Sequence, residues 1–383
     1  MSGILSELEQ SGLFLGRVWN ATAEGPSVIT LREDLVVDIS SRSAPMVRDI
    51  CEMDDPESYV RSAPGQPLGT LTEISSAAVG DANVTHLLAP CDLHAIKACG
   101  VTFANSMVER VIEERASGDP QKAEAVRQRV GEMIGDSLRD IKPGSKEAVQ
   151  VKEALIAEGL WSQYLEVGIG PDAEVFSKAQ VLSSVGSGAE VGLHPISQWN
   201  NPEPEIVLAV SSKGRIVGAT LGNDVNLRDV EGRSALLLPE AKDNNASCAI
   251  GPLIRLFDES FTLDDVRQLE LDLRVEGPDG FALEGHSSMK EISRDPKDLV
   301  RQTVGRHHQY PDGFMLFLGT LFAPTEDRDV PGEGFTHKLG DIVSISAPGL
   351  GTLVNTVRLS TECPEWTFGI SELMRNLSSR NLI

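Results

Sequence analysis

The chain has 383 residues, enough for two or three domains or for one large domain with an appendage. Hydrophobic residues make up 40% and charged residues 24%, and no apolar run approaches the roughly 18 residues of a membrane span, so we expect no membrane segment. The 34 basic residues stand against 57 acidic ones, a net charge of −23, and a surface this negative repels phosphate backbones, which argues against a nucleic-acid partner.

Residues 1–94 are predicted to form a small mixed α/β domain. The apolar runs LFLGRVW, SVITL and LVVDIS are separated by turn-forming residues, a pattern that indicates a strand meander. One helix is expected from about Met46 to Val60. Pro90 marks the seam to a second domain, residues 95–383, in which we expect the catalytic site.

A helical insertion is predicted at about residues 106–165. Apolar residues recur there at spacings of three and four, as on the buried face of an amphipathic helix. The stripe consists of Val126, Val130, Met133, Ile134, Leu138 and Ile141. Two or three helices would fit this segment.

From about Val175 onward, short runs rich in β-branched and aromatic residues predict a β-rich core. They include EIVLAV, RIVGATL, QLELDLRV, GFMLFLGT and DIVSISA, each bounded by Gly, Pro or Asn. The chain as a whole is therefore expected to be an α+β, β-rich protein.

The five cysteines are odd in number and show no CxxC spacing, so neither a disulfide framework nor a zinc site is predicted. The N-terminus shows neither the basic segment nor the apolar segment of a secretory signal. Both observations lead us to expect a cytoplasmic protein.

The segment from Asn201 to Asp229 carries the most chemical information. The turn residues SSKG between two apolar runs predict a hairpin. If Val210 pairs with Arg215, Glu205 lies opposite Thr220 and Glu203 opposite Gly222. Residues two apart on a strand share a face, so Glu203, Glu205 and Asp224 would converge.

Three neighbouring carboxylates repel one another unless a cation lies among them. Their oxygen atoms favour a hard ion, Mg²⁺ first, with Mn²⁺ or Ca²⁺ as alternatives, and leave positions open for substrate and water. Each residue taken alone could be an ordinary acidic residue at a strand end. Two observations together favour a metal site. The three residues share one face of the hairpin, and Pro202 and Pro204 on either side of Glu203 cannot donate to a strand ladder, which indicates an edge or a loop-like entry there.

Several motifs of the chain resemble those of a known family, the fumarylacetoacetate hydrolase superfamily. The likeness lies in the EPE pair, the NDVNLRD segment, Lys242 in AKDNN and the C-terminal GLGTLVNTV, and it covers roughly residues 95–360. The resemblance implies a C-terminal-type mixed β-roll or barrel core, with Mg²⁺ held by Glu203, Glu205 and Asp224.

Within that superfamily the chain is most similar to the 2-keto-3-deoxy-pentonate dehydratases. The matching charged residues are Glu174, Lys178, Glu203, Glu205, Asp224 and Lys242. Lys178 follows Glu174 by 4 residues, Glu203 follows Lys178 by 25, Asp224 follows Glu203 by 21, and Lys242 follows Asp224 by 18. The resemblance implies Glu174 and Lys242 as an acid and base pair, Lys178 as a possible holder of the substrate carboxylate, and Thr320 as a substrate contact.

One departure from the family pattern bears on the reaction. Hydrolytic members carry a His-x-x-Glu pair, whereas this chain has Ser106 at the histidine position and retains Glu109. A serine does not take a proton from water at neutral pH unaided, as a histidine does. Ser106 is then a substrate contact, and Glu109 either takes part in the chemistry or orders its helix.

The implied function is a Mg²⁺-dependent dehydratase that converts 2-keto-3-deoxy-pentonate, from D-xylonate or D-arabinonate, to 2,5-dioxopentanoate in pentose catabolism. The alternative is a carbon–carbon hydrolase or decarboxylase of acylpyruvates or other 2-keto acids. The expected partner is a small-molecule sugar acid. By analogy with the family, a homodimer or homotetramer is expected.

Overall fold

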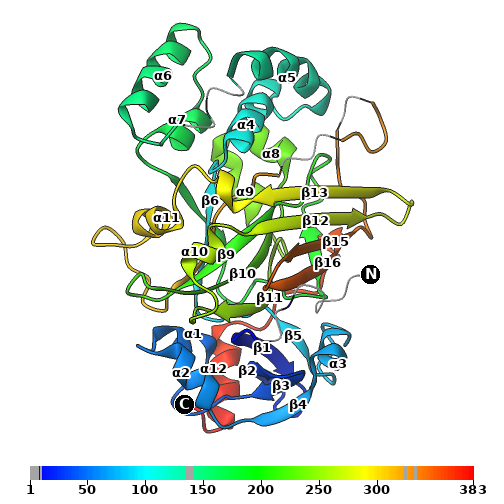
Figure 1. Cartoon of the computed structure of the whole chain (residues 1–383). Helices are drawn as coiled ribbons and strands as arrows, with labels where there is room; N and C mark the ends of the chain where they lie inside the picture. Colours follow the sequence, from blue (N-terminus) through cyan, green and yellow to red (C-terminus); the bar gives the residue numbers. More distant parts are fainter. Residues whose placement is uncertain (1–7, 9–10, 135–137, 139–140, 323–325, 332–333) are drawn as a thin grey trace.

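The computed structural model describes residues 8, 11–134, 138, 141–322, 326–331 and 334–383 of the chain, and its strands lie in two sheets (Figure 1). The strands of the larger sheet are β1 (Phe14–Asn20), β2 (Gly25–Arg32), β3 (Leu35–Asp38), β4 (Gln66–Thr70), β5 (His86–Leu88), β6 (Ala95–Gly100), β7 (Glu174–Ala179), β9 (Pro204–Val210), β10 (Ile216–Asp224), β11 (Cys248–Leu256) and β14 (Phe314–Phe317). The strands of the smaller sheet are β8 (Glu190–Leu193), β12 (Glu270–Glu276), β13 (Ala282–Ser288), β15 (Ile342–Ala347) and β16 (Gly351–Leu359).

Both sheets are open. The eleven-stranded sheet has the order β4-β3-β2-β1-β11-β10-β9-β14-β6-β7, with β5 added to β1, and the five-stranded sheet has the order β13-β12-β15-β16-β8. Two pairs are parallel, β14 with β6 and β16 with β8, so each sheet is mixed. The α+β, β-rich prediction is confirmed, and the described strands form a roll rather than a closed barrel.

The N-terminal unit lies at the lower end of the molecule in Figure 1 and contains β1 to β5 with three short helices. These helices are α1 (Val47–Glu52), α2 (Pro56–Ser62) and α3 (Leu71–Ser75). The meander is as predicted, but the single helix expected near residues 46–60 is two helices. Asp55 caps a new helix that Pro56 begins, and proline has no N–H with which to continue the hydrogen bonding of α1.

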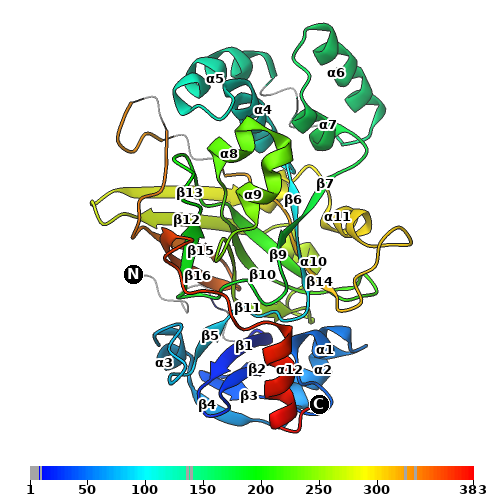
Figure 2. The same ribbon diagram turned by 180° about the vertical axis from the view of Figure 1, so that it is seen from behind.

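The last helix of the chain, α12 (Ile370–Ser379), packs on this N-terminal unit, as Figure 2 shows from behind. Leu373 and Leu377 are buried there, and the side-chain amide of Asn376 donates to the carbonyl oxygen of Ala23 across 3.0 Å. The expected domain boundary at residue 94 lies in the β5–β6 loop. Two contacts nevertheless join the units on either side of this boundary. The C-terminal helix α12 packs on the N-terminal unit, and β1 pairs with β11.

The helical insertion stands at the opposite end of the molecule from the N-terminal unit (Figure 1). Its helices are α4 (Ala104–Ala116), α5 (Pro120–Ile134), α6 (Lys146–Ala157) and α7 (Gln163–Ile169). There are four described helices where two or three were expected, because α5 ends at Ile134 and Ser145 caps a separate helix. Residues 135–137 and 139–140, within the predicted stripe, lie outside the described residues.

Shorter helical segments follow the strands. They are α8 (Arg228–Arg233), the 3₁₀ turn η2 (Ala235–Leu237), α9 (Leu238–Lys242), α10 (Leu263–Val266), the 3₁₀ turn η3 (Met289–Glu291) and α11 (Pro296–Thr303). Within the described part of the chain, no helix has both the length and the apolar character needed to cross a membrane.

The hairpin of β9 and β10 forms as predicted, but its register differs. The backbone N–H of Ser211 donates to the carbonyl oxygen of Arg215, one residue away from the predicted pairing, and a bulge between Ile216 and Gly218 shifts the register by one more. Glu205 therefore faces Gly222, and Glu203 faces Asp224. The predicted partners were wrong by two positions, but two is the side-chain period of a strand, so the predicted face is unchanged.

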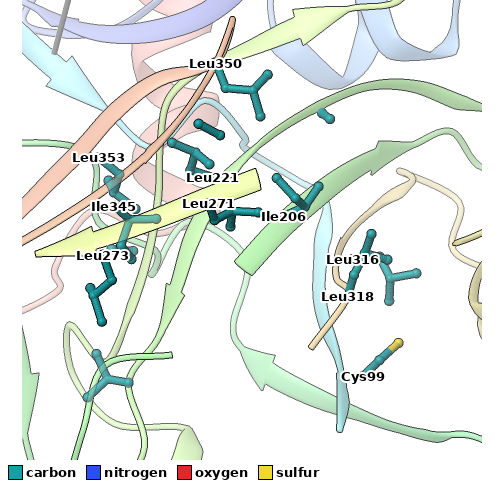
Figure 3. Packing of buried hydrophobic residues seen from close by; sticks show 14 of the residues in the cluster. Cys99, Ile206, Leu221, Leu271, Leu273, Leu316, Leu318, Ile345, Leu350 and Leu353 are labelled. Carbon is teal, nitrogen blue, oxygen red and sulfur yellow. The ribbon is translucent and has the colours of Figure 1, made fainter. Parts of the chain in front are cut away.

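Buried apolar side chains between the two sheets hold this hairpin in place. Figure 3 shows part of the cluster, in which Ile206 and Leu221 of the hairpin lie near Leu271 and Leu273 of β12. All four are at most 2% exposed. Because close-packed interiors tolerate little movement, the ends of β9 and β10 are fixed in space.

Candidate active site

Three carboxylates meet at one end of the β9–β10 hairpin. Glu203 lies in the segment just before β9, Glu205 is the second residue of β9, and Asp224 ends β10. One oxygen of each lies within 4.8 Å of the others, and the three residues are only 2 to 4% exposed. The predicted convergence of Glu203, Glu205 and Asp224 is therefore present in the structure.

The prolines beside Glu203 lie where the chain enters β9. β9 is an interior strand between β10 and β14, not an edge. Pro204 is the first residue of the strand, and Pro202 precedes it. Both positions suit a residue that has no N–H for the ladder.

Basic groups neutralise two of the three carboxylates. The ammonium nitrogen of Lys242 lies 2.6 Å from Glu203 Oε2 and 3.2 Å from Asp224 Oδ2. Lys178 Nζ lies 3.1 Å from Asp224 Oδ1, and Arg110 Nη2 lies 2.6 Å from Glu203 Oε1. These pairs leave Glu205 with a weaker partner, the backbone N–H of Gly319 at 2.6 Å.

The carboxyl pKa values reflect this uneven pairing. Burial, Asp224 and Glu203 raise the pKa of Glu205 well above its ordinary value. For Asp224, burial acts in the same direction, but the ammonium groups of Lys242 and Lys178 outweigh it and lower the pKa. Glu205 is thus the one carboxyl group of the three whose ionised form the neighbouring cations do not stabilise enough to offset burial and the other two carboxylates.

These residues fit a hard divalent cation. They offer oxygen ligands from three side chains, which is the donor set that Mg²⁺, Mn²⁺ or Ca²⁺ prefers. A cation bound there would compensate the charge of Glu205. Glu203, Glu205 and Asp224 are therefore the residues that would hold it.

Glu174, the first residue of β7, lines the same cavity as the three carboxylates. The cavity has a free volume of about 20 Å³, room for about one water molecule or ion. The lining residues are Cys99, Gly100, Val101, Ser106, Arg110, Glu174, Phe176, Glu203, Glu205, Asp224, Glu231, Lys242, Gly319 and Thr320.

The expected acid and base pair thus lines one cavity, and the pKa of both groups is raised. Burial raises the pKa of Glu174, with Glu203 and Asp224 adding to the effect and Arg110 and Lys242 opposing it. Burial would lower the pKa of Lys242, but the carboxylates of Asp224, Glu203 and Glu231 outweigh it and raise the pKa. The protonated form of Glu174 and the charged form of Lys242 are therefore each favoured relative to the same group in water.

Two of the three expected substrate contacts, Ser106 and Thr320, line the cavity. Ser106 lies in the first turn of α4, and its hydroxyl donates to the carbonyl oxygen of Phe103 across 2.9 Å. Thr320 follows Gly319, whose φ of 92° lies in the left-handed region. A side chain at position 319 would overlap the Thr102 hydroxyl, so glycine is needed where the backbone approaches Glu205.

Two expected site residues are not in the cavity that holds Glu174 and Lys242. Lys178 is fully buried behind Asp224, donates to the carbonyl oxygen of Lys242 and does not line this cavity. Its contact with a substrate carboxylate stays a prediction. Glu109 was expected either to take part in the chemistry or to order its helix. It is held by Arg127, with two contacts of 2.9 Å, and by Arg228 at 3.2 Å, and lines an adjoining cavity.

The sequence reasoning missed Arg110 and Glu231. Arg110 follows Ser106 by four residues, so both lie on one face of α4. Its guanidinium contacts Glu113 at 2.6 Å, Glu231 at 3.1 Å and Glu203. The spacing from Ser106 could have identified Arg110, but Glu231 reaches the cavity only because α8 folds back over it.

The comparisons agree with this geometry. Residues 170–358 match the family model of the fumarylacetoacetate hydrolase C-terminal domain. The carboxylate cluster, Glu174 and Lys242 all lie within the part of the chain that matches this family model.

Two curated relatives make the likeness more specific. A probable 2-keto-3-deoxyxylonate dehydratase of Haloferax volcanii is 32% identical over 194 residues, which cover 51% of this chain and 63% of the relative. A 2-dehydro-3-deoxy-D-arabinonate dehydratase of Saccharolobus solfataricus is 31% identical over 185 residues, 48% of this chain and 58% of the relative. The matches therefore span less than two thirds of each relative.

Solved structures share the fold over most of the chain. The apo form of a 2-keto-3-deoxy-D-arabinonate dehydratase is 21% identical, with a TM-score of 0.64 over 90% of this chain and 99% of that one. A structure of that type of enzyme complexed with magnesium and 2,5-dioxopentanoate is 20% identical, with a TM-score of 0.62 and the same coverage.

Proposed function

We propose that the protein is a Mg²⁺-dependent hydro-lyase that converts a 2-keto-3-deoxy-pentonate to 2,5-dioxopentanoate in oxidative pentose catabolism. One observation carries the proposal: three buried carboxylates converge on a cavity that also holds a protonatable Glu174 and Lys242. The names of the curated relatives, and the magnesium and 2,5-dioxopentanoate bound in a structural neighbour, support it.

The reaction removes one water from a five-carbon acid. A proton leaves C3 and the hydroxyl leaves C4 as water, and the C5 hydroxymethyl group then becomes an aldehyde as hydrogen moves from C5 back to C3 and from the C5 hydroxyl to C4. A divalent cation at Glu203, Glu205 and Asp224 supplies Lewis-acid polarisation of the 2-keto group when it is bound. The protein's part is to hold and move the protons.

Glu174 and Lys242 are the groups we propose for these transfers. A raised pKa lets Glu174 keep a proton that it can donate to a leaving hydroxyl. Lys242 can accept a proton only when the carboxylates that keep it charged are compensated by another cation. Exchange of the C3 protons with deuterated water distinguishes which of the two acts at C3 and which at C4.

A carbon–carbon hydrolase needs a base that activates water. No histidine is among the described residues that line the cavity, and the Ser106 hydroxyl is already donated to Phe103. The residues of the cavity therefore support a dehydratase better than they support the alternative function, a hydrolase or decarboxylase of acylpyruvates or other 2-keto acids.

The direct test is an assay with the purified full chain and Mg²⁺. We expect racemic 2-keto-3-deoxy-pentonate to yield 2,5-dioxopentanoate, detected as the aldehyde, with the rate lost in EDTA and restored by Mg²⁺ or Mn²⁺. Turnover of an acylpyruvate without aldehyde formation from the sugar acid would contradict the proposal and favour the hydrolase.

We also propose that the enzyme is cytoplasmic and forms a homodimer or homotetramer. All five cysteines are buried and unpaired, as suits a reducing compartment. The proposed assembly rests on the family resemblance, and light scattering coupled to size-exclusion chromatography would test it.

A further inference from the structure

A second cavity adjoins the first on the side away from Glu174. It shares four lining residues with the first cavity, namely Ser106, Arg110, Glu203 and Thr320. Its other walls include Asn201, Asn226 and Arg228. Its free volume is also about 20 Å³, room for one water-sized group.

Two asparagines continue the row of site residues into this second cavity. Asn201 and Asn226 pair through two backbone hydrogen bonds of 3.1 Å, in the same register as Glu203 with Asp224. Asn226 lies two residues beyond Asp224, and Asn201 two before Glu203, about 6.7 Å along a strand. The amides therefore share a face with the carboxylates, one strand repeat farther on.

The side-chain amide of Asn226 has unused hydrogen-bonding capacity. Asn226 is 1% exposed, yet neither its Nδ2 nor its Oδ1 has a hydrogen-bond partner among the described residues. Asn201 Oδ1 also lacks one within that part of the chain, although its Nδ2 donates to Pro202. Buried polar groups are nearly always paired, so a donor and acceptor facing a cavity indicate a polar occupant.

The charges of the second cavity favour a neutral occupant. Arg228 lies 2.7 Å from Glu113 and stacks at 4.2 Å on the ring of Trp199, while Arg110 contacts both Glu113 and Glu203. The cationic walls are thus already paired with carboxylates. A hydroxyl group fits such surroundings and this volume, whereas a phosphate fits neither.

We infer that Asn226, supported by Asn201, binds the C5 hydroxyl of the substrate and makes the enzyme prefer 2-keto acids with a terminal hydroxyl. The inference rests on the proposed function, which places the carboxylate and keto group beside Glu203, Glu205 and Asp224. A chain held at C1 and C2 presents C3 and C4 to Glu174 and Lys242 in the first cavity, and its C5 end points toward the amides of the adjoining cavity. Asn226 is accordingly a specificity-determining residue.

Two ligands that cannot lose water test this role without relying on turnover. The Mg²⁺-loaded full chain is titrated calorimetrically with 5-hydroxy-2-oxopentanoate and with 2-oxopentanoate, which differ only in the terminal hydroxyl. We expect the wild-type protein to bind the hydroxylated acid about tenfold more tightly. Asn226→Ala should bind both equally, with its Mg²⁺ affinity unchanged.

The controls separate this role from a structural one. Asn83→Ala, at an exposed asparagine, should keep the tenfold preference. Asn226→Ser, which retains a hydroxyl, should keep part of it and serves if the alanine variant does not fold. A wild-type protein that binds both acids equally, or an Asn226→Ala variant that keeps the preference, overturns the inference. Mg²⁺ binding with no affinity for either acid overturns the proposed function itself.

Discussion

The backbone N–H of Asp224 donates to the carbonyl oxygen of Glu203 across 3.0 Å. The two residues are thus opposed across the end of the β9–β10 hairpin, where like charges destabilise a sheet. Lys242 offsets this repulsion, since its ammonium lies 2.6 Å from Glu203 and 3.2 Å from Asp224, and the apolar side chains of the hairpin are buried between two sheets. Burial of the apolar core thus stabilises a hairpin end at which three carboxylates lie close together.

Glu203→Gln should remove metal binding without unfolding the protein. Glutamine keeps the volume but not the charge of a residue that contributes one of three candidate ligands. We expect the Mg²⁺ dissociation constant, measured by calorimetry, to rise by about 100-fold or more and dehydration to cease. Glu284→Gln, at an exposed position of β13, is the matched control. An unchanged Mg²⁺ affinity would refute the metal assignment.

Lys242→Met and Glu174→Gln should separate the two proton transfers. Both variants should bind Mg²⁺ and lose dehydration, with rates falling about 100-fold or more. The measurement is exchange of the C3 protons of 2-oxopentanoate with deuterated water, which needs only the base. The variant that loses exchange lacks the base at C3, and the variant that keeps it lacks the donor at C4. Near-normal dehydration in either variant would exclude that residue from the pair.

Glu231→Gln should make the metal-free protein less sensitive to pH. Burial, helped by Glu203 and Glu113 and opposed by Arg110 and Lys242, raises the pKa of Glu231 from 4.5 to about 7. The folded state then binds this proton more tightly than the unfolded state does, so stability is lost as pH rises from 4.5 to 7.

The size of this effect is roughly 1 to 3 kcal/mol in the free energy of unfolding. Urea denaturation in EDTA across that pH range measures it, and the variant should show a shallower decline than the wild type. Glu240→Gln, at an exposed position of α9, should leave the profile unchanged. Parallel profiles for wild type and Glu231→Gln would show that Glu231 does not titrate in this window.

Gly319→Ala should disturb both stability and metal binding. The added methyl would meet Thr102 at a left-handed φ and displace the N–H that holds Glu205. Gly280→Ala is a matched control, since its φ is 85° but nothing lies within 4 Å of a methyl there. We expect Gly319→Ala to cost about 2 kcal/mol more than the control and to weaken Mg²⁺ binding. Equal costs would mean that the close approach is unimportant.

Leu377→Ala should show how strongly α12 joins the two ends of the chain. Leu377 is 1% exposed between α12 and the N-terminal unit, whereas Met374 on the same helix is 55% exposed. Urea denaturation should give a loss of about 2 to 5 kcal/mol for Leu377→Ala and less than about 0.5 kcal/mol for Met374→Ala. A loss as small as that of the control would show that this contact contributes little.

Much of the site could be predicted because it depends on short-range periodicity. Glu203 and Glu205 are two apart on an extended segment, and the hairpin turn between Ser211 and Arg215 brings Asp224 back to them. The predicted register was one residue off at the turn, and the bulge after Ile216 added another. The face survived only because the two shifts sum to one strand period.

The positions of Lys178, Glu109 and Glu231 depend on packing. The spacing that relates Lys178 to Glu174 is the same whether its ammonium reaches substrate or lies behind Asp224, and only the three-dimensional path of α9 decides between them. The ion pairs of Glu109 with Arg127 and Arg228 could not be predicted from the sequence, because the two arginines belong to two other helices, α5 and α8.

The sequence alone determined the β-rich α+β class and the convergence of Glu203, Glu205 and Asp224, since strand alternation and local spacing are properties of neighbouring residues. The assignment of Glu174 and Lys242 as an acid and base pair stays a prediction that the family resemblance supplies. Only the tertiary structure decided that α12 returns to the N-terminal unit, which charged side chains face the cavity, and that Asn226 lies buried without a partner among the described residues. These features depend on contacts between segments far apart in the chain, and no local pattern encodes them.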